Sequence, residues 1–349
     1  MTSVGRWAYL LVQLNLTAIM LSSFAMAVYV FYGTEVGRSS LGKPLTSAPV
    51  FFVGVGENVP TLLSQGVVFG VLWVLYLVLI VNSIFGHRLS LLSAWRSALR
   101  DGLRESSRNT MLSLTSVFSA LTLIVYLLDL VQNSAGIPSG TLVEREPLET
   151  FTLLSLAPLT EEIGFRLSII GLFGALFLAE RPTAGRLLRI LWHPSANLDL
   201  RSSSPLARWR RKSVTVLIVI SAVAFGFAHI GYGLDPTQGW EIGKVTTSAI
   251  SGIILGYMYV YYGLPGAILL HWSFNFLVGA YRYFDCSLAG TWVSCLEREA
   301  GPASTFLELS VFVAGGVSLL AFGLALFNQY RTRRAQGLLV PQPAPDSTQ

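Results

Sequence analysis

Three of the long apolar runs in this sequence contain polar side chains that could do chemistry. They are Glu161, Glu162 and Arg166 in the first run, His229 at the end of the second, and His271 with Asn275 in the third. Ionisable groups at membrane depth are costly unless they are paired or face water. We therefore treat each of these polar residues first as a candidate functional residue.

The spacing within the first group predicts two different roles for its glutamates. Glu162 and Arg166 are four residues apart, so on a helix they face each other and can form an ion pair. Glu161 points about 100° away around the helix and has no cation nearby in the sequence. We expect Glu162 and Arg166 to be structural, and Glu161 to be free to act as a general base.

His271 and Asn275 are also four residues apart and project from one helical face. An imidazole N–H and a side-chain amide are donors that can stabilise a developing oxyanion. His229 alone is ambiguous, because a single histidine on an apolar helix is usually a packed core residue. Phe225, one turn earlier, is expected to pack against its ring.

The composition places this chemistry in a membrane. The 349 residues are 52% hydrophobic and 12% charged, whereas soluble chains are about a quarter charged. Several apolar runs of about twenty residues can each cross a hydrocarbon core, and backbone groups in a bilayer require helices. We predict an all-α polytopic membrane protein with about eight transmembrane helices. The predicted spans are residues 7–32, 62–86, 111–132, 150–178, 214–230, 245–262, 265–284 and 305–330.

Basic residues predict the orientation of these spans. Arginines and lysines gather in residues 87–109, 180–213 and 331–334, and eight spans place all three segments on one side. The positive-inside rule then puts both termini in the cytoplasm of a multi-pass cell-membrane protein. The net charge of +5 is explained in this way, and nucleic-acid binding is not expected.

The remaining sequence predicts a single membrane domain, residues 1–330, and a disordered cytoplasmic tail, residues 331–349. A cleaved signal peptide is an alternative for residues 1–32, although the apolar run is long for one. The only cysteines, Cys286 and Cys295, lie in a loop predicted to be outside, where either a disulfide or two free thiols would be compatible with the spacing.

The three groups together resemble the motifs of the CAAX prenyl protease and bacteriocin-processing family of intramembrane proteases. The family pattern is EExxxR, FxxxH and HxxxN or HxxxD, and residues 161–166, 225–229 and 271–275 match every fixed position in order. The resemblance covers about residues 150–284. It implies peptide-bond hydrolysis in which Glu161 and His229 activate water, while His271 and Asn275 form the oxyanion hole.

The resemblance also leaves a metal-dependent alternative. Glu161, His229 and His271 could supply three ligands to a zinc ion, with Glu162 as the base. Because this arrangement would draw Glu162 away from Arg166, we favour a site without a cofactor or metal.

We therefore expect an intramembrane endopeptidase that cleaves a membrane-associated protein or peptide. The family implies a prenylated or a bacteriocin-like substrate. The rival hypothesis is a transporter or a non-catalytic scaffold, which would explain Glu162 with Arg166 but not the other four residues. Simple depth counting leaves one difficulty, since it puts His229 near the outer end of its span and His271 nearer the inner end.

Overall fold

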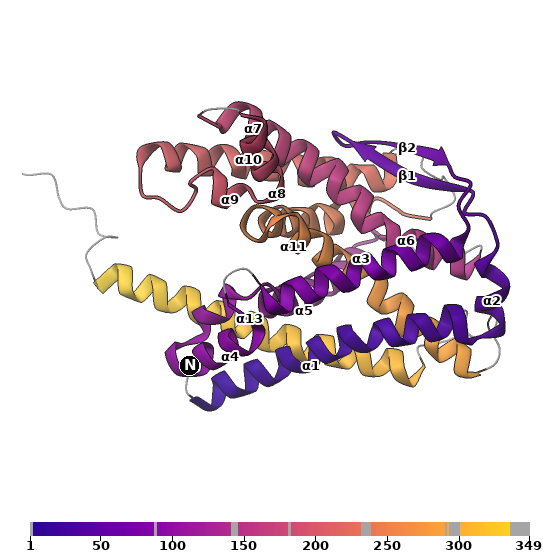
Figure 1. Cartoon of the computed structure of the whole chain (residues 1–349). Helices are drawn as coiled ribbons and strands as arrows, with labels where there is room; N and C mark the ends of the chain where they lie inside the picture. Colours follow the sequence, from indigo (N-terminus) through magenta and orange to yellow (C-terminus); the bar gives the residue numbers. More distant parts are fainter. Residues whose placement is uncertain are drawn as a thin grey trace, which may run out of the picture.

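The computed structural model of the chain is a bundle of long helices with one small β-hairpin (Figure 1). The structure describes residues 3–86, 89–140, 146–180, 183–231, 239–289, 292 and 301–335. Within these residues, six helices are long and apolar enough to cross a membrane. The helices that contain them are α1 (Ser3–Val28), α3 (Gln65–Phe85), α5 (Thr110–Ser134), α10 (Pro205–Gly231), α11 (Gly243–Ala289) and α13 (Pro302–Ala335). The predicted all-α polytopic membrane fold is confirmed.

All eight predicted spans are helical, although only six of the described helices are long enough to count as spans. The difference has two causes: α11 contains two of the predicted spans, and the predicted span 150–178 is divided among three shorter helical segments. Helix α11 is broken at Gly263, where φ is 79°, so its two halves match the predicted spans 245–262 and 265–284. A Cβ atom at Gly263 would lie 2.7 Å from the Trp192 carbonyl oxygen, so glycine is required both for this φ and for the close approach. The predicted span 150–178 is continuous but changes its helix type along its length.

That span begins as α6 (Pro147–Glu161), continues as the π-helix η3 (Glu162–Leu172) and ends as α7 (Phe173–Leu178). The change from α- to π-helix therefore falls between the two adjacent glutamates of the first motif. π-Helical segments are rare and are found frequently at functional sites.

Short helices lie between the long ones. They are η1 (Tyr29–Gly33), α2 (Glu35–Leu41), α4 (Leu91–Asp101), η2 (Leu103–Arg108), α8 (Ala184–Trp192) and α9 (Pro194–Asn197). Figure 1 shows α4, α8, α9 and the N-terminus at one end of the bundle, and α2 and the hairpin at the opposite end. We call the first the basic end, because the arginine-rich segments 87–109 and 180–213 include α4, α8 and α9, and the second the hairpin end.

The β-hairpin was not expected from the sequence. Strands β1 (Ser47–Phe52) and β2 (Val55–Pro60) pair antiparallel, with Phe52 opposite Val55. The two turn residues, Val53 and Gly54, both have positive φ, as a two-residue turn that matches strand twist requires. Valine is unfavourable at such a position, so the sequence lacks the usual Asn-Gly or Asp-Gly signal.

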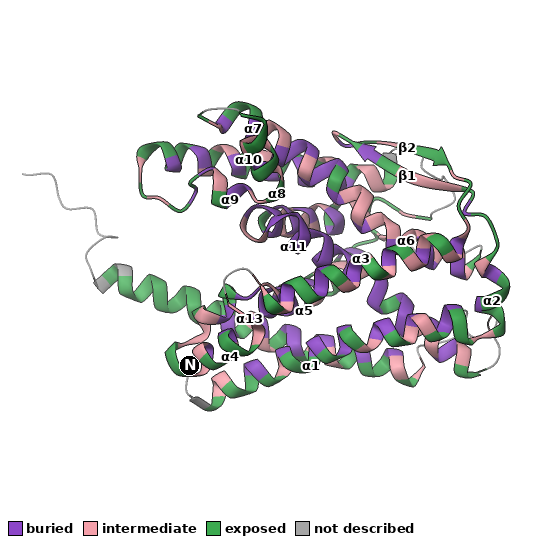
Figure 2. Ribbon diagram, in the orientation of Figure 1, coloured by how far each residue is buried: buried purple, intermediate pink, exposed green. Residues whose placement is uncertain are grey.

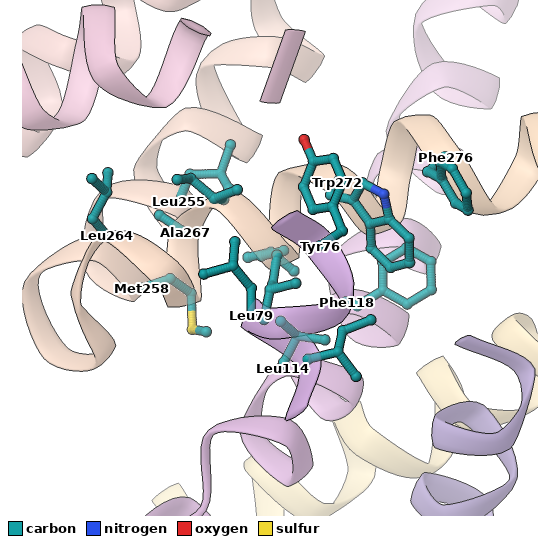
Figure 3. Packing of buried hydrophobic residues seen from close by; sticks show 14 of the residues in the cluster. Tyr76, Leu79, Leu114, Phe118, Leu255, Met258, Leu264, Ala267, Trp272 and Phe276 are labelled. Carbon is teal, nitrogen blue, oxygen red and sulfur yellow. The ribbon is translucent and has the colours of Figure 1, made fainter. Parts of the chain in front are cut away.

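The core lies where α11 meets α3 and α5. Figure 3 shows Tyr76 and Leu79 of α3 with Phe118 of α5 and Trp272 of α11 among its members. The rings of Tyr76 and Trp272 lie 5.3 Å apart, centroid to centroid. In Figure 2 the purple, buried residues lie on the inner faces of the helices and the green, exposed residues on the outer faces. Many exposed residues are themselves apolar, as expected for helices that face lipid.

The ends of the predicted segments need two additions. Helix α13 continues to Ala335, which is beyond the predicted span 305–330 and into the predicted tail; residues 336–349 lie outside the described residues. Cys286 is disulfide-bonded, whereas Cys295 lies outside the described residues.

Candidate active site

The π-helix η3 sets the position of the first motif. Its carbonyl groups are satisfied from outside the helix: the Gly164 carbonyl oxygen accepts a hydrogen bond from Gly54 N at 3.0 Å, and the Phe165 carbonyl oxygen accepts one from Ser221 Oγ at 3.0 Å. Ser168 Oγ in turn accepts from Val53 N at 3.0 Å. Backbone groups at membrane depth need such protein partners, because lipid offers none. The hairpin turn and α10 therefore help to hold η3 in its unusual conformation.

Glu162 joins two of the three motifs. Its Oε1 atom lies 3.2 Å from Arg166 Nη1, and both side chains are fully buried. The same oxygen lies 2.9 Å from Nδ1 of His271 on α11. An ionised carboxylate only accepts hydrogen bonds, so Nδ1 of His271 carries the proton and donates it to Glu162. The predicted structural pair is present, and it also fixes the orientation of the His271 ring.

Glu161 has a different environment. Its Oε2 atom lies 3.6 Å from His271 Nε2, and its side chain is 16% exposed. This oxygen is buried and has no hydrogen-bond partner among the described residues. Glu162 Oε2 is unpartnered as well, but of the two glutamates only Glu161 lines the cavity described below. A bound water or substrate would satisfy its oxygen, and its role as a general base stays a prediction.

His229 is oriented by its own helix. Its Nδ1 atom lies 2.8 Å from the Phe225 carbonyl oxygen. A carbonyl only accepts, so Nδ1 carries the proton, and the neutral ring leaves Nε2 as an acceptor. The Phe225 ring is nearly perpendicular to both imidazoles, with centroids 4.8 Å from His229 and 5.7 Å from His271. Arg166 Cζ lies over the Phe225 ring, 4.1 Å from its centroid.

One cavity of about 390 Å³ brings the predicted residues together. Glu161, His229, His271 and Asn275 all line it. Depth counting places His229 and His271 near opposite ends of their spans. In the structure both side chains line the same cavity, and Phe225 packs against both rings. The cavity also includes residues of the hairpin end, namely Thr46, Ser47, Pro49, Phe51, Asn58, Glu146 and Glu149.

Two contributions to this cavity were missed from sequence. Phe51 of the hairpin lines it and packs against Phe165 of η3, with ring centroids 5.4 Å apart. Lys244, at the start of α11, lines it as well, and its Nζ lies 3.9 Å from the Trp240 ring centroid. Its sequence signal was one lysine directly before an apolar run, which is ordinarily only a membrane boundary.

The zinc alternative fits this arrangement poorly. Among the described residues, no group of three or more His, Cys, Asp or Glu side chains is arranged to hold a metal ion. Glu162 would have to act as the base in that version of the site. It is instead engaged by Arg166 and by His271 Nδ1.

A comparison with protein-family models agrees with the motifs. Residues 144–277 match the model described as type II CAAX prenyl endopeptidase Rce1-like, and this range includes all seven fixed motif residues discussed above. No curated protein and no solved structure gave a significant match to the chain. The predicted family resemblance is confirmed over residues 144–277, and this match is consistent with a protease of the CAAX protease and bacteriocin-processing family.

Proposed function

We propose that this protein is an intramembrane endopeptidase that hydrolyses a peptide bond with a water molecule activated by Glu161. The observation that carries the proposal is the orphaned Glu161 oxygen, 3.6 Å from His271 Nε2, in a cavity also lined by His229 and Asn275. The Rce1-like domain supports the reaction class, and the residue roles are our inference.

The first step is removal of a proton from water. Glu161 accepts this proton while His229 Nε2 holds the water by accepting its other O–H. The hydroxide attacks the carbonyl carbon of the peptide and forms a tetrahedral intermediate. Glu161 then returns the proton to the departing amine, so that a carboxylate and an amine are released. No covalent enzyme intermediate is required.

The second requirement is stabilisation of the oxyanion. The Asn275 amide donates one hydrogen bond to it. His271 lines the same cavity and is the second oxyanion ligand that we propose, with its ring oriented by the hydrogen bond from Nδ1 to Glu162. Glu162 and Arg166 act through His271, and we regard them as positioning residues rather than catalytic ones.

The position of the cavity bears on how substrate enters. Its lining includes Glu146, Glu149 and the hairpin, at the end of the bundle opposite the basic end. If the basic end is cytoplasmic, as the positive-inside rule predicts, the mouth of the cavity faces away from the cytoplasm. We propose that the substrate is a membrane-associated protein or peptide that presents its cleaved segment at that face.

We infer the substrate class, prenylated or bacteriocin-like, from this predicted topology. The matched family model names CAAX prenyl endopeptidases, which suggests a lipidated tail as substrate. A cytoplasmic tail would have to enter from the basic end, where the described cavity residues do not lie. The arrangement therefore supports a peptide substrate at the opposite face.

The test is a cleavage assay on the full chain in lipid nanodiscs. A library of quenched-fluorescent peptides, half of them carrying a C-terminal prenyl group, is offered to wild type, Glu161→Gln and Glu35→Gln. Glu35 is exposed on α2 and does not line the cavity, which makes it a matched carboxylate control. We expect wild type and Glu35→Gln to cleave and Glu161→Gln to lose about 10²–10⁴-fold in rate.

If the protein is a transporter or a scaffold, none of the three proteins will cleave the peptides. If both variants lose cleavage rate equally, Glu161 is not the specific base that we propose. A strong chelator serves as a further arm of the same assay. Activity lost to the chelator and restored by zinc would replace the proposed site with the metal-dependent one.

A further inference from the structure

A second cavity lies apart from the candidate active site. It has a volume of about 550 Å³ and is formed by α5, α11 and α13, with contributions from η2 and the segment before α10. Its lining residues are Ser107, Val117, Ala120, Leu121, Ile124, Arg201, Ile254, Tyr257, Met258, Tyr261, Tyr262, Leu319 and Phe322. None of them lines the first cavity.

Most of this cavity is an apolar groove. Leu121 and Met258 are buried at its base, while Ile124, Tyr257 and Phe322 are more than a third exposed along its walls. Helix α5 begins at Thr110, and the rise from there to Ile124 is about 21 Å. The groove therefore extends from η2 to a point about 21 Å along α5, which is more than half the thickness of a hydrocarbon core of about 30 Å.

The end of the groove near the basic end is polar. Arg201 is the only charged residue in the lining, and it forms no ion pair with any described residue. Nearby, Tyr262 donates a hydrogen bond from its hydroxyl to the Ser107 carbonyl oxygen at 3.2 Å. A guanidinium without a counter-ion, beside hydroxyl groups, is suited to a phosphate.

We infer that this groove binds an anionic phospholipid, with one acyl chain between α5, α11 and α13 and the phosphate on Arg201. An open apolar groove in a bilayer is filled by hydrocarbon chains, because an empty one would forfeit dispersion contacts. Basic pockets between transmembrane helices on the cytoplasmic side are suited to anionic headgroups. We expect Arg201 to favour lipids with a negatively charged headgroup, and the contacts between the acyl chain and the apolar groove to provide most of the binding free energy.

The experiment measures thermal stability of the full chain in detergent while dioleoyl-phosphatidylglycerol or dioleoyl-phosphatidylcholine is added. Both lipids have the same acyl chains, so the difference between their shifts in melting temperature isolates the headgroup. Arg201→Gln removes the proposed phosphate ligand. Arg208→Gln is the matched control, since Arg208 is exposed on α10 near the same end and does not line the groove.

We expect phosphatidylglycerol to raise the melting temperature of wild type and of Arg208→Gln more than phosphatidylcholine does, and Arg201→Gln to lose this difference. Equal shifts for the two lipids in wild type would overturn the proposal, as would an undiminished preference in Arg201→Gln. Ile124→Trp, which narrows the groove at an exposed wall, should reduce the shifts from both lipids. Native mass spectrometry of wild type gives a measurement that depends on no variant: a retained phosphatidylglycerol supports the site, and retention of phosphatidylcholine in equal amount contradicts it.

Discussion

His271 Nδ1 and Glu162 Oε1 lie 2.9 Å apart, and the same carboxylate oxygen lies 3.2 Å from Arg166 Nη1. One buried glutamate therefore connects the helix of the first motif with the helix of the third. This connection gives the two adjacent glutamates different environments. Glu162 is committed to orienting its neighbours, which leaves Glu161 as the carboxylate that faces the cavity.

The buried ion pair predicts a large stability effect. Arg166→Met would leave the Glu162 carboxylate buried without its cation, and removal of one partner of such a pair costs roughly 3–5 kcal/mol. We expect the free energy of unfolding, measured by SDS titration in mixed micelles, to fall by this amount. Arg108→Gln breaks an exposed pair with Glu105 and should cost less than about 1 kcal/mol. Equal losses in the two variants would show that the buried pair contributes nothing special.

The contact between the hairpin and η3 predicts that Gly164 cannot carry a side chain. A Cβ atom there would meet the Phe51 side chain and lie 2.9 Å from the Phe51 carbonyl carbon. Gly164→Ala should therefore displace the hairpin and destabilise the fold by about 1–3 kcal/mol. The readout is limited proteolysis of the hairpin together with thermal unfolding. Gly174→Ala is the control, because its nearest neighbour is 3.8 Å away, and a hairpin equally protected in both variants would refute the proposed contact.

The Phe225 ring predicts a moderate effect on catalysis. It packs against His229 and His271, and each such aromatic contact contributes about 0.5–1.5 kcal/mol. Phe225→Leu should lower kcat/KM by about tenfold, which corresponds to ~1.4 kcal/mol, without unfolding the protein. Phe227→Leu changes the same residue type on the lipid-facing side of α10, where Phe227 is 51% exposed, and should leave the rate unchanged. A rate that falls equally in the two variants would argue against a positioning role for Phe225.

The proposed orientation, with the basic end in the cytoplasm, predicts which residues a membrane-impermeant reagent can label. Leu62 lies fully exposed beyond the hairpin, and Arg189 lies exposed on α8 at the basic end. In intact cells, a membrane-impermeant maleimide should label Leu62→Cys, and it should label Arg189→Cys only after the membrane is permeabilised. The reverse pattern would place the cavity mouth on the cytoplasmic side and favour a cytoplasmic lipidated tail as substrate.

Hydropathy and spacing predicted most of the transmembrane architecture, because long apolar runs in a bilayer have few alternatives to helices. The pair of Glu162 with Arg166 followed from a four-residue spacing. The link from Glu162 to His271 did not, since it joins residues 109 positions apart through tertiary packing. The sequence also gave no sign of the π-helix, whose carbonyls depend on partners from the hairpin and α10.

Two other features, the hairpin and the position of Lys244, could not be predicted because their local sequences carry no distinctive signal. The hairpin turn uses valine at a positive φ, so it has no recognisable turn signal, and docking on η3 compensates for this conformation. Lys244 stands at the first turn of α11, where a lysine is indistinguishable by sequence from a membrane-boundary residue. Only the fold reveals that it lines the same cavity as Glu161.

The role of Glu161 as a base that activates water can be measured by isotope transfer. Wild type is allowed to cleave an identified peptide over many turnovers in water enriched in ¹⁸O, and both the product and the Glu161-containing fragment of the protein are weighed by mass spectrometry. If Glu161 acts as a general base, ¹⁸O appears in the newly formed carboxylate of the product and none appears in Glu161. Incorporation of ¹⁸O into the Glu161 carboxylate would show that Glu161 attacks the substrate directly, and would rule out its role as the base.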